Sequence, residues 1–287
     1  MKIGILGGGL MGNALAQHLL TQQCELSIYN RSIEKIADLN THGARICSAA
    51  SEAVEKSEIV VLLLSDADAI ATVLDSVAPG AFMDKLFIQM GTIAPQQSQH
   101  IEHQLNSAGA DYLECPVLGS LPEARSGKLI LMAAGMEDNY QRALPLLKMI
   151  GETPRYIGRT GQAAAVKLAL NQLIAGLTAT FSLSLALIEE NGIDVDQFMQ
   201  ILRESALYAP TFDKKLDRMR NRNFSDPNFP TKHLAKDTRL FLEVGEQLRL
   251  DTSALEGINR LLDKTIAMGL DNTDYSALYA AISPDRK

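Results

Sequence analysis

The sequence predicts an α/β, doubly wound sheet followed by an all-α C-terminal domain. Short apolar segments alternate with helical patterns through the first half of the 287-residue chain, as repeated βα units do. After Gly161 the pattern is helical, with almost no strand signal. Hydrophobic residues make up 46% of the chain, which allows a sizeable core and excludes wholesale disorder. We therefore place two domains at residues 1–160 and 161–287.

The first domain contains six predicted strands. The run 58–64 is continuously apolar, which is typical of a strand buried on both faces of a sheet. Helical patterns follow the first strand as far as Leu20, cover residues 33–39 and begin again after Pro95. Because βα crossovers connect parallel strands, we expect a parallel sheet. The predicted strands are residues 2–6, 25–29, 58–64, 85–90, 111–115 and 128–134.

The second domain begins with an uncharged stretch between Lys167 and Glu189. Its length alone would allow a membrane span. However, polar residues such as Asn171 fall within it and no second segment resembles it, so we expect a buried central helix and no membrane partner. The helical pattern is interrupted near Gly192, near Pro210 and across residues 221–230.

Charge and cysteine content exclude several classes of protein. The net charge of −7 argues against a general nucleic-acid or anionic-membrane surface. Cys24, Cys47 and Cys115 are widely spaced and odd in number, so they predict no disulfide framework, and a reducing, cytoplasmic setting fits. His100 and His103 lie three residues apart on a predicted helix, but no third ligand accompanies them, and we expect no metal site.

A glycine-rich turn separates the first strand from the first helix. Its sequence, Gly7-Gly8-Gly9-Leu10-Met11-Gly12, is a GxGxxG pattern in the context that binds a dinucleotide. Gly7 permits the tight turn, Gly9 lets a pyrophosphate approach the backbone, and Gly12 lets helix and strand pack closely. The N–H groups at the helix N-terminus, including those near Leu10 and Met11, favour phosphate. This predicts a Rossmann-type cofactor domain.

The end of the second strand predicts which cofactor is bound. A site for NAD places Asp or Glu here to bind the ribose 2′-hydroxyl. This strand ends instead in Tyr29-Asn30-Arg31-Ser32. Asn30 has no charge to repel a 2′-phosphate, Arg31 can bind one through its guanidinium, and Ser32 can donate its hydroxyl or cap the next helix. We therefore predict NADP(H).

Several motifs in order resemble the β-hydroxyacid dehydrogenase family (3-hydroxyisobutyrate dehydrogenase-like), closest to its NADPH-dependent glyoxylate/succinic semialdehyde reductases. That resemblance implies a helical second domain like that of 6-phosphogluconate dehydrogenase, with Lys167 as the catalytic lysine and Asn171 as its partner. The two residues are four apart, hence on one helical face, and an ammonium can protonate a developing alkoxide. The motifs that carry the resemblance are Gly7–Gly12, Asn30–Ser32, Cys115–Ser120, Gly158–Asn171 and Phe229–Asp237.

The same resemblance implies further site residues, with one notable departure. The family loop usually supplies a serine hydroxyl to the substrate carboxylate, but Leu118 occupies that position. Losing one charged hydrogen bond costs about 1.5–3 kcal/mol. Either Ser120 compensates or the substrate is less polar. The residues implied are Thr92 and Lys236 for the cofactor, and Leu118, Gly119, Ser120, Phe229 and Asp237 for the substrate.

We therefore predict an NADPH-dependent reductase of a small aldehyde-acid, active as a homodimer or homotetramer, with its site between the domains. Two alternatives stay open: an imine reductase-like enzyme with a more apolar pocket, against which Lys167 counts, and a non-catalytic NADP-binding protein. The segment 213–239 carries a net charge of +4. It is either a solvated face or a positive rim that attracts an anionic substrate and cofactor.

Overall fold

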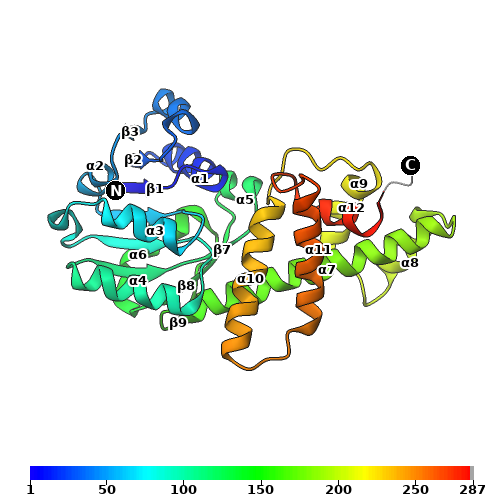
Figure 1. Ribbon diagram of the computed structural model, residues 1–287. Coiled ribbons are helices and arrows are strands. Elements are labelled where there is room, and N and C mark those ends of the chain that lie inside the picture. Colours follow the sequence, from blue (N-terminus) through cyan, green and yellow to red (C-terminus); the bar gives the residue numbers. More distant parts are fainter. Residues whose placement is uncertain (285–287) are drawn as a thin grey trace. The chain divides into compact units, whose positions relative to one another are not determined.

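The computed structural model describes residues 1–284 of the chain. The chain divides into two compact units, Met1–Lys167 and Leu168–Lys287. One long helix, α7 (Gln162–Glu190; Figure 1), contains the division. Its first six residues belong to the first unit.

A mixed sheet forms the centre of the first unit. Its strands follow the order β3-β2-β1-β4-β5-β6-β8-β7, with β9 paired to β8. All pairs among strands β1 to β6 are parallel, which confirms the predicted doubly wound fold. The chain order reverses between β1 and β4, and open α/β sheets bind ligands beside such a point. The bounds are β1 Lys2–Leu6, β2 Glu25–Tyr29, β3 Arg45–Cys47, β4 Ile59–Leu62, β5 Leu86–Gln89, β6 Asp111–Glu114, β7 Val117–Leu118, β8 Ile130–Gly135 and β9 Arg155–Gly158.

The far side of the sheet departs from the prediction of a parallel sheet. Strand β8 runs antiparallel to β6, where Leu113 pairs with Gly135, and antiparallel to β7, where Leu118 pairs with Ile130. The connection explains the difference. Between β6 and β8 the chain forms only β7 and the short helix α5 (Leu121–Ser126), which is not the helical crossover that a parallel neighbour requires.

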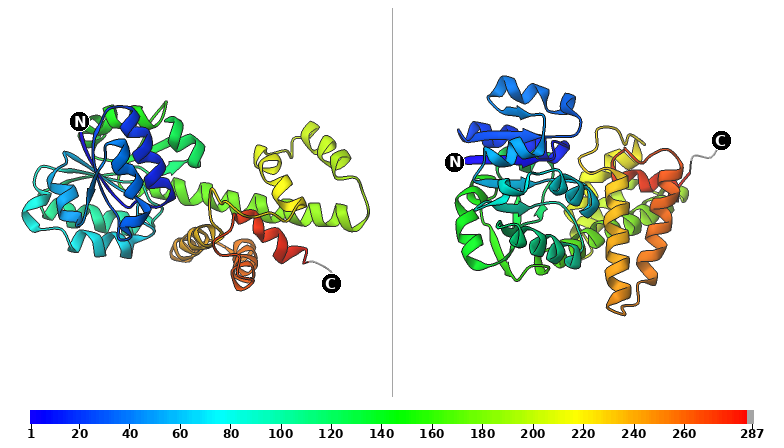
Figure 2. Two further views of the ribbon diagram at one scale, coloured as in Figure 1. Left: turned by 90° about the horizontal axis from the view of Figure 1, so that it is seen from above. Right: turned by 60° about the vertical axis from the view of Figure 1, so that its left-hand side comes forward.

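Helices cover both faces of this sheet (Figure 2). The predicted helix at 33–39 is instead two 3₁₀ turns, η1 (Ile33–Lys35) and η2 (Ala37–His42). They are interrupted at Ile36, which leaves the helical conformation at a φ of −124° and is completely buried. The remaining helices are α1 Leu10–Thr21, α2 Ala50–Glu55, α3 Ala67–Asp75, η3 Pro79–Phe82, α4 Pro95–Ser107 and α6 Glu137–Ile150.

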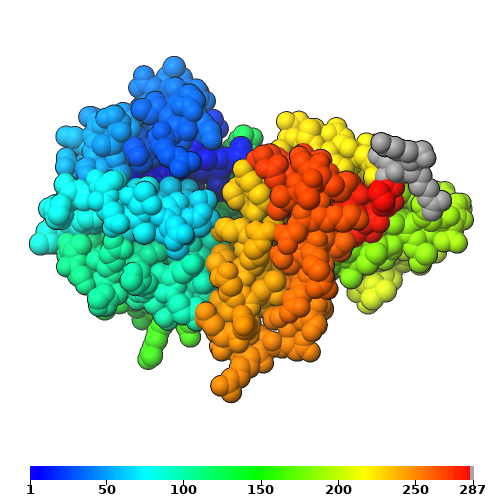
Figure 3. All heavy atoms as spheres, viewed as in Figure 1, coloured from blue at the N-terminus to red at the C-terminus, as the bar shows by residue number. Residues whose placement is uncertain are grey.

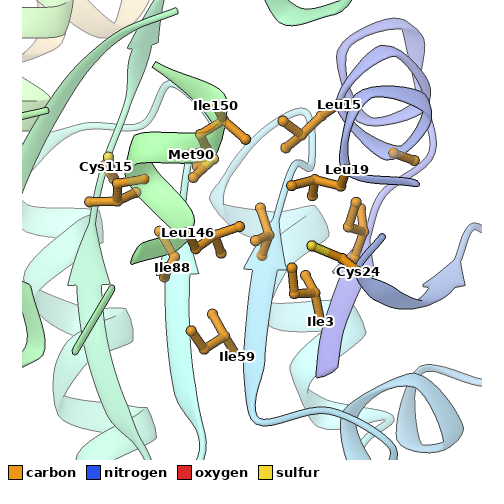
Figure 4. Packing of buried hydrophobic residues seen from close by; sticks show 14 of the residues in the cluster. Ile3, Leu15, Leu19, Cys24, Ile59, Ile88, Met90, Cys115, Leu146 and Ile150 are labelled. Carbon is orange, nitrogen blue, oxygen red and sulfur yellow. The ribbon is translucent and has the colours of Figure 1, made fainter. Parts of the chain in front are cut away.

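Two apolar cores lie on opposite faces of the sheet. In β4, Ile59 and Val61 belong to one core and Val60 and Leu62 to the other, because successive strand side chains point to opposite faces. Leu15 and Leu19 of α1 and Leu146 and Ile150 of α6 close the first core (Figure 4). Full burial of one such side chain contributes about 1.5–3 kcal/mol.

The second unit is helical, as predicted: residues 168–284 form no strand beyond one isolated bridge between Pro230 and Asp274. Its helices break at the three places that the sequence indicates. Helices α10 and α11 lie side by side and form one continuous surface (Figure 3, orange). The bounds are α8 Val195–Glu204, α9 Pro210–Arg220, α10 Thr231–Gln247, α11 Ser253–Ala267, η4 Tyr275–Ala277 and α12 Leu278–Ile282.

The central helix α7 is long and apolar enough to pass a length and hydropathy test for a membrane span. Within the second unit it nevertheless contributes to two packed cores. Ala175 and Ala179 pack in a core with α10 and α11, and Phe181 and Leu185 in a core with α8 and α9. The most hydrophobic window of α7 is 39% buried, so the helix packs into these cores and also leaves apolar side chains exposed.

Candidate active site

The glycine turn has the geometry that a dinucleotide needs. Gly7 adopts a φ of +111°, and a Cβ added there would lie 2.3 Å from the carbonyl oxygen of Leu63. A Cβ on Gly12 would lie 1.9 Å from the carbonyl oxygen of Gly7, so this helix packs closely against the turn. A Cβ on Gly9 would meet nothing within 4 Å. The turn is therefore rigid at Gly7 and Gly12 and open at Gly9, which fits an approaching pyrophosphate.

The first turn of α1 supplies the polar groups for this cradle. Leu10 begins the helix with its side chain 53% exposed, and Met11 is half-buried against the first core. The N–H groups of a first helical turn have no partner within the helix, and they carry a partial positive charge. An acidic chain can hold phosphates here through local geometry.

Asn30 connects the glycine turn to the end of β2. Its Oδ1 accepts a hydrogen bond from the N–H of Gly8 at 3.0 Å, and its Nδ2 donates to the carbonyl oxygen of Ser32 at 2.8 Å. Arg31, between them, is exposed. Ser32 lies at the start of η1 but makes no side-chain capping bond, so the capping role suggested for it is wrong. The segment therefore presents an uncharged amide, a guanidinium and a hydroxyl at the edge of the sheet.

Thr92 lies after β5, at the same carboxyl-terminal edge of the parallel strands as the glycine turn. It is half-buried in the loop between β5 and α4. The buried Gln89 holds this loop by donating its side-chain N–H to the carbonyl oxygen of Gly91 at 3.1 Å. The sheet thus places Thr92 at the same edge as the glycine turn and Asn30, although β4 separates β5 from β1.

The loop predicted to bind the substrate has few free donors. Leu118 ends β7 half-buried, and Gly119 is exposed. Both the N–H and the hydroxyl of Ser120 donate to Oε2 of Glu123, at 2.7 and 2.6 Å. The bond from the N–H belongs to a capping box at the start of α5. The hydroxyl that was to compensate for Leu118 is therefore already used, and the Ser-x-x-Glu spacing could have revealed this from sequence.

Asn171 and Asp237 are brought together within the second unit, although they are far apart in sequence. Asn171 Nδ2 donates to Asp237 Oδ2 at 2.6 Å, and Lys236 Nζ lies 2.9 Å from Asp237 Oδ1. Asn171 and Asp237 are only 2% and 3% exposed. Asn171 Oδ1 is buried and, within the described chain, has no hydrogen-bond partner. Lys167, one turn earlier on α7, is half-buried.

Phe229 is placed partly in the core of the second unit. Its ring is parallel to that of His233 at 6.5 Å between centroids, and meets the ring of Tyr275 edge-on at 5.9 Å. Phe229 therefore packs against the core that α10 and α11 contribute to, and remains partly exposed.

The basic segment 213–239 is less open than its charge suggested. At least four of its eight cations form ion pairs with carboxylates, and Lys215 is buried. These contacts favour a structural role for much of the positive charge over a rim that attracts substrate. The pairs are Lys215–Asp274, Arg220–Asp196, Lys236–Asp237 and Arg239–Asp263.

One buried carboxylate was missed by the sequence reasoning. Glu114, at the end of β6, is 1% exposed and accepts hydrogen bonds from the first turn of α7. Burial raises its pKa, and hydrogen bonds from Ser98 and the helix N–H groups oppose that shift. Burial, with the charge of Glu114, also raises the pKa of Cys115, which keeps this thiol protonated and unreactive.

Among residues 1–284, no cluster of His, Cys, Asp or Glu could hold a metal ion.

Comparison with known proteins decides the family. Residues 2–158 match the NAD-binding domain of 6-phosphogluconate dehydrogenase, and residues 161–282 match the NAD-binding domain of NADP-dependent 3-hydroxyisobutyrate dehydrogenase. Glyoxylate/succinic semialdehyde reductase 1 of Arabidopsis thaliana is 30% identical over the full length of both chains. The chain belongs to the 3-hydroxyisobutyrate dehydrogenase-like family. It is therefore a NAD(P)-dependent hydroxyacid dehydrogenase or reductase that acts on a CH–OH group.

Two further comparisons agree with this family. The chloroplastic glyoxylate/succinic semialdehyde reductase 2 of Arabidopsis thaliana is 30% identical over 98% of this chain and 79% of its own length. The solved structure of 3-hydroxyisobutyrate dehydrogenase from Mycobacterium tuberculosis superposes with a TM-score of 0.85, at 21% identity, and covers 98% of both chains. The fold of this dehydrogenase family is thus shared along nearly the entire chain, and the predicted cofactor NADP(H) is confirmed by the two domain matches.

Proposed function

We propose that this enzyme uses NADPH to reduce a small aldehyde-acid of the glyoxylate or succinic semialdehyde type to its hydroxy acid. The observation that carries the proposal is the arrangement on α7: Asn171 is fixed by Asp237 and keeps a buried acceptor oxygen, one turn after Lys167. The relatives named for these two substrates support the substrate class. The engaged hydroxyl of Ser120 points the other way, towards the less polar substrate of the imine reductase alternative, and the screen below compares the two.

Lys167 is the proton donor in this proposal. NADPH, when bound, supplies the hydride to the carbonyl carbon. The ammonium of Lys167 stabilises the negative charge that develops on the carbonyl oxygen and then transfers a proton from Nζ to it. Asn171 positions Lys167 in this proposal. The hydrogen bond to Asp237 fixes the orientation of the Asn171 amide. A positioned general acid contributes about 10²- to 10⁴-fold in rate.

The preference for NADPH over NADH rests on the end of β2. The side-chain amide of Asn30 forms hydrogen bonds with the backbone of both Gly8 and Ser32. It therefore holds the loop in place without adding a negative charge. Arg31 is exposed beside it and offers a planar donor to a 2′-phosphate. Gly9 would let the pyrophosphate approach the backbone, while Gly7 forms the tight turn and Gly12 lets α1 pack closely against it.

We further propose a homodimer or homotetramer in the cytoplasm, with neither nucleic acid nor membrane as a partner. Apolar side chains on α7 support self-association, since Leu173, Leu183 and Leu187 are 54%, 56% and 65% exposed in a single chain. Light scattering coupled to size exclusion measures the state, and a monomer at micromolar concentration refutes this part of the proposal.

The central experiment is an NADPH-oxidation screen with the wild type and Lys167→Ala. The panel contains glyoxylate, succinic semialdehyde, methylglyoxal, tartronate semialdehyde and a cyclic imine, with NADH in parallel. We expect turnover of an aldehyde-acid that Lys167→Ala reduces at least a hundredfold. Wild-type turnover by Lys167→Ala on every aldehyde refutes the acid assignment. A cyclic imine reduced faster than glyoxylate supports the imine reductase alternative, and tight NADPH binding without turnover supports the non-catalytic one.

A further inference from the structure

Glu114 joins two parts of the first unit that sequence separates. Its Oε1 accepts hydrogen bonds from the N–H groups of Gly161, Ala163 and Ala164, at 2.9, 2.8 and 3.2 Å. Its Oε2 accepts the hydroxyl of Ser98. Four donors converge on one carboxylate, which is the environment that stabilises an ionised acid. These N–H groups would otherwise be unsatisfied at the buried start of α7.

This anchor lies one turn from the proposed proton donor. In an α-helix the N–H of residue i donates to the carbonyl oxygen of residue i−4, and Ala163 stands four residues before Lys167 on α7. The N–H of Lys167 thus donates to the carbonyl oxygen of Ala163. Glu114 binds the N–H of Ala164, which belongs to that same peptide group. Glu114 also directly precedes Cys115, which begins the loop that carries Leu118.

Burying a charged Glu114 is less favourable than burying a neutral side chain that accepts the same hydrogen bonds. Burial of a charge is unfavourable, and burial raises the pKa of Glu114 despite its four donors. A neutral Gln could accept the same backbone N–H groups through its own oxygen. The charge adds two properties: charge-assisted hydrogen bonds, which are roughly twice as strong as neutral ones, and compensation of the positive helix N-terminus close to Lys167.

We propose that Glu114 is a positioning residue, which holds the first turn of α7 and so fixes Lys167 and the adjoining substrate loop. This inference rests on the proposed function of Lys167. The helix N-terminus favours loss of a proton from a nearby ammonium, and the negative charge of Glu114 opposes that tendency. Glu114 interacts electrostatically with Tyr112 and Cys115, and Tyr112 also interacts with Glu102 on α4.

The test compares Glu114→Gln with Glu102→Gln in the full-length enzyme. Glu102 is the matched control, since its Oε1 accepts the hydroxyl of Thr160 at 2.7 Å, just before α7, but the side chain is not fully buried. For Glu114→Gln we expect kcat to fall about tenfold to a hundredfold, because a small misplacement of a catalytic group has effects of this size. The basic limb of the kcat profile should move to lower pH, with NADPH affinity within about twofold of wild type.

Three outcomes overturn the inference: an unchanged kcat and pH profile in Glu114→Gln, an equal loss in Glu102→Gln, or a kcat loss that only tracks a lowered melting temperature. If Glu114→Gln does not fold, Ser98→Ala keeps the charge and removes the donor to Oε2; a wild-type kcat there also overturns the inference. Lys167→Ala separates the two proposals. An inactive Lys167→Ala beside a normal Glu114→Gln rejects the positioning role alone, whereas an active Lys167→Ala rejects the proposed function.

Discussion

Replacing Leu118 with Ser tests how this enzyme recognises a carboxylate. The leucine ends β7 where the family supplies a serine hydroxyl, and the neighbouring Ser120 cannot substitute, because Glu123 takes both its N–H and its hydroxyl at 2.7 and 2.6 Å. The wild-type loop therefore offers a substrate carboxylate no side-chain hydroxyl and places a second carboxylate nearby. We expect Leu118→Ser to improve the use of carboxylate substrates specifically.

The size of the effect follows from one hydrogen bond. A hydrogen bond to a charged group contributes about 1.5–3 kcal/mol, and each 1.4 kcal/mol is tenfold. Leu118 is only half-buried, so its removal should cost little stability. The expected gain in kcat/KM is thus about tenfold to a hundredfold. Adding Glu123→Gln should increase it further, because a neutral amide holds the Ser120 donors less tightly and no longer repels an anion.

The assay compares glyoxylate with methylglyoxal, an aldehyde of similar size that has no carboxylate. The ratio of the two kcat/KM values removes effects on the cofactor and on folding. Leu118→Ala is the matched control, since it removes the same bulk without adding a hydroxyl. If the ratio for folded Leu118→Ser stays within about twofold of wild type, or if Leu118→Ala raises it equally, then a hydroxyl at this position does not recognise the substrate.

Three other predictions follow from charges in the structure. Lys215→Met leaves Asp274 buried without the ammonium now 2.8 Å away, and should lower the free energy of unfolding in urea by about 3–5 kcal/mol. Arg203→Met, in an exposed ion pair, should lower it by under about 1 kcal/mol. Equal losses in the two variants contradict this prediction. Arg31→Ala should lower the NADPH-to-NADH ratio of kcat/KM about tenfold or more, and an unchanged ratio argues against a 2′-phosphate contact. Because burial raises the pKa of Glu114 above 4.5, its stabilising contribution is present below the unfolded pKa and is lost as pH rises through the folded pKa. The wild type should therefore lose stability relative to Glu114→Gln from about pH 4 towards 7, and a constant difference across this range refutes the shift.

The sequence by itself determined the features that a few neighbouring residues encode. The glycine turn is one of them, because the strand, the tight turn and the helix start lie within about ten residues and each glycine has a steric reason. The end of β2 at Asn30 and Arg31 and the change from alternating to helical pattern near Gly161 are equally local. The capping box of Ser120 and Glu123 was also readable in principle, since both partners lie within one helical turn.

The tertiary structure alone decided the contacts between distant segments. Asn171 meets Asp237 across 66 positions, and Glu114 meets Ala163 across 49. The antiparallel course of β8 depends likewise on how α5 fills the connection after β6. No periodicity records such contacts, because they depend on which buried polar group must find a donor or acceptor once helices and strands have packed. The sequence thus provided the cofactor turn and the lysine, and only packing showed what holds that lysine's helix in place.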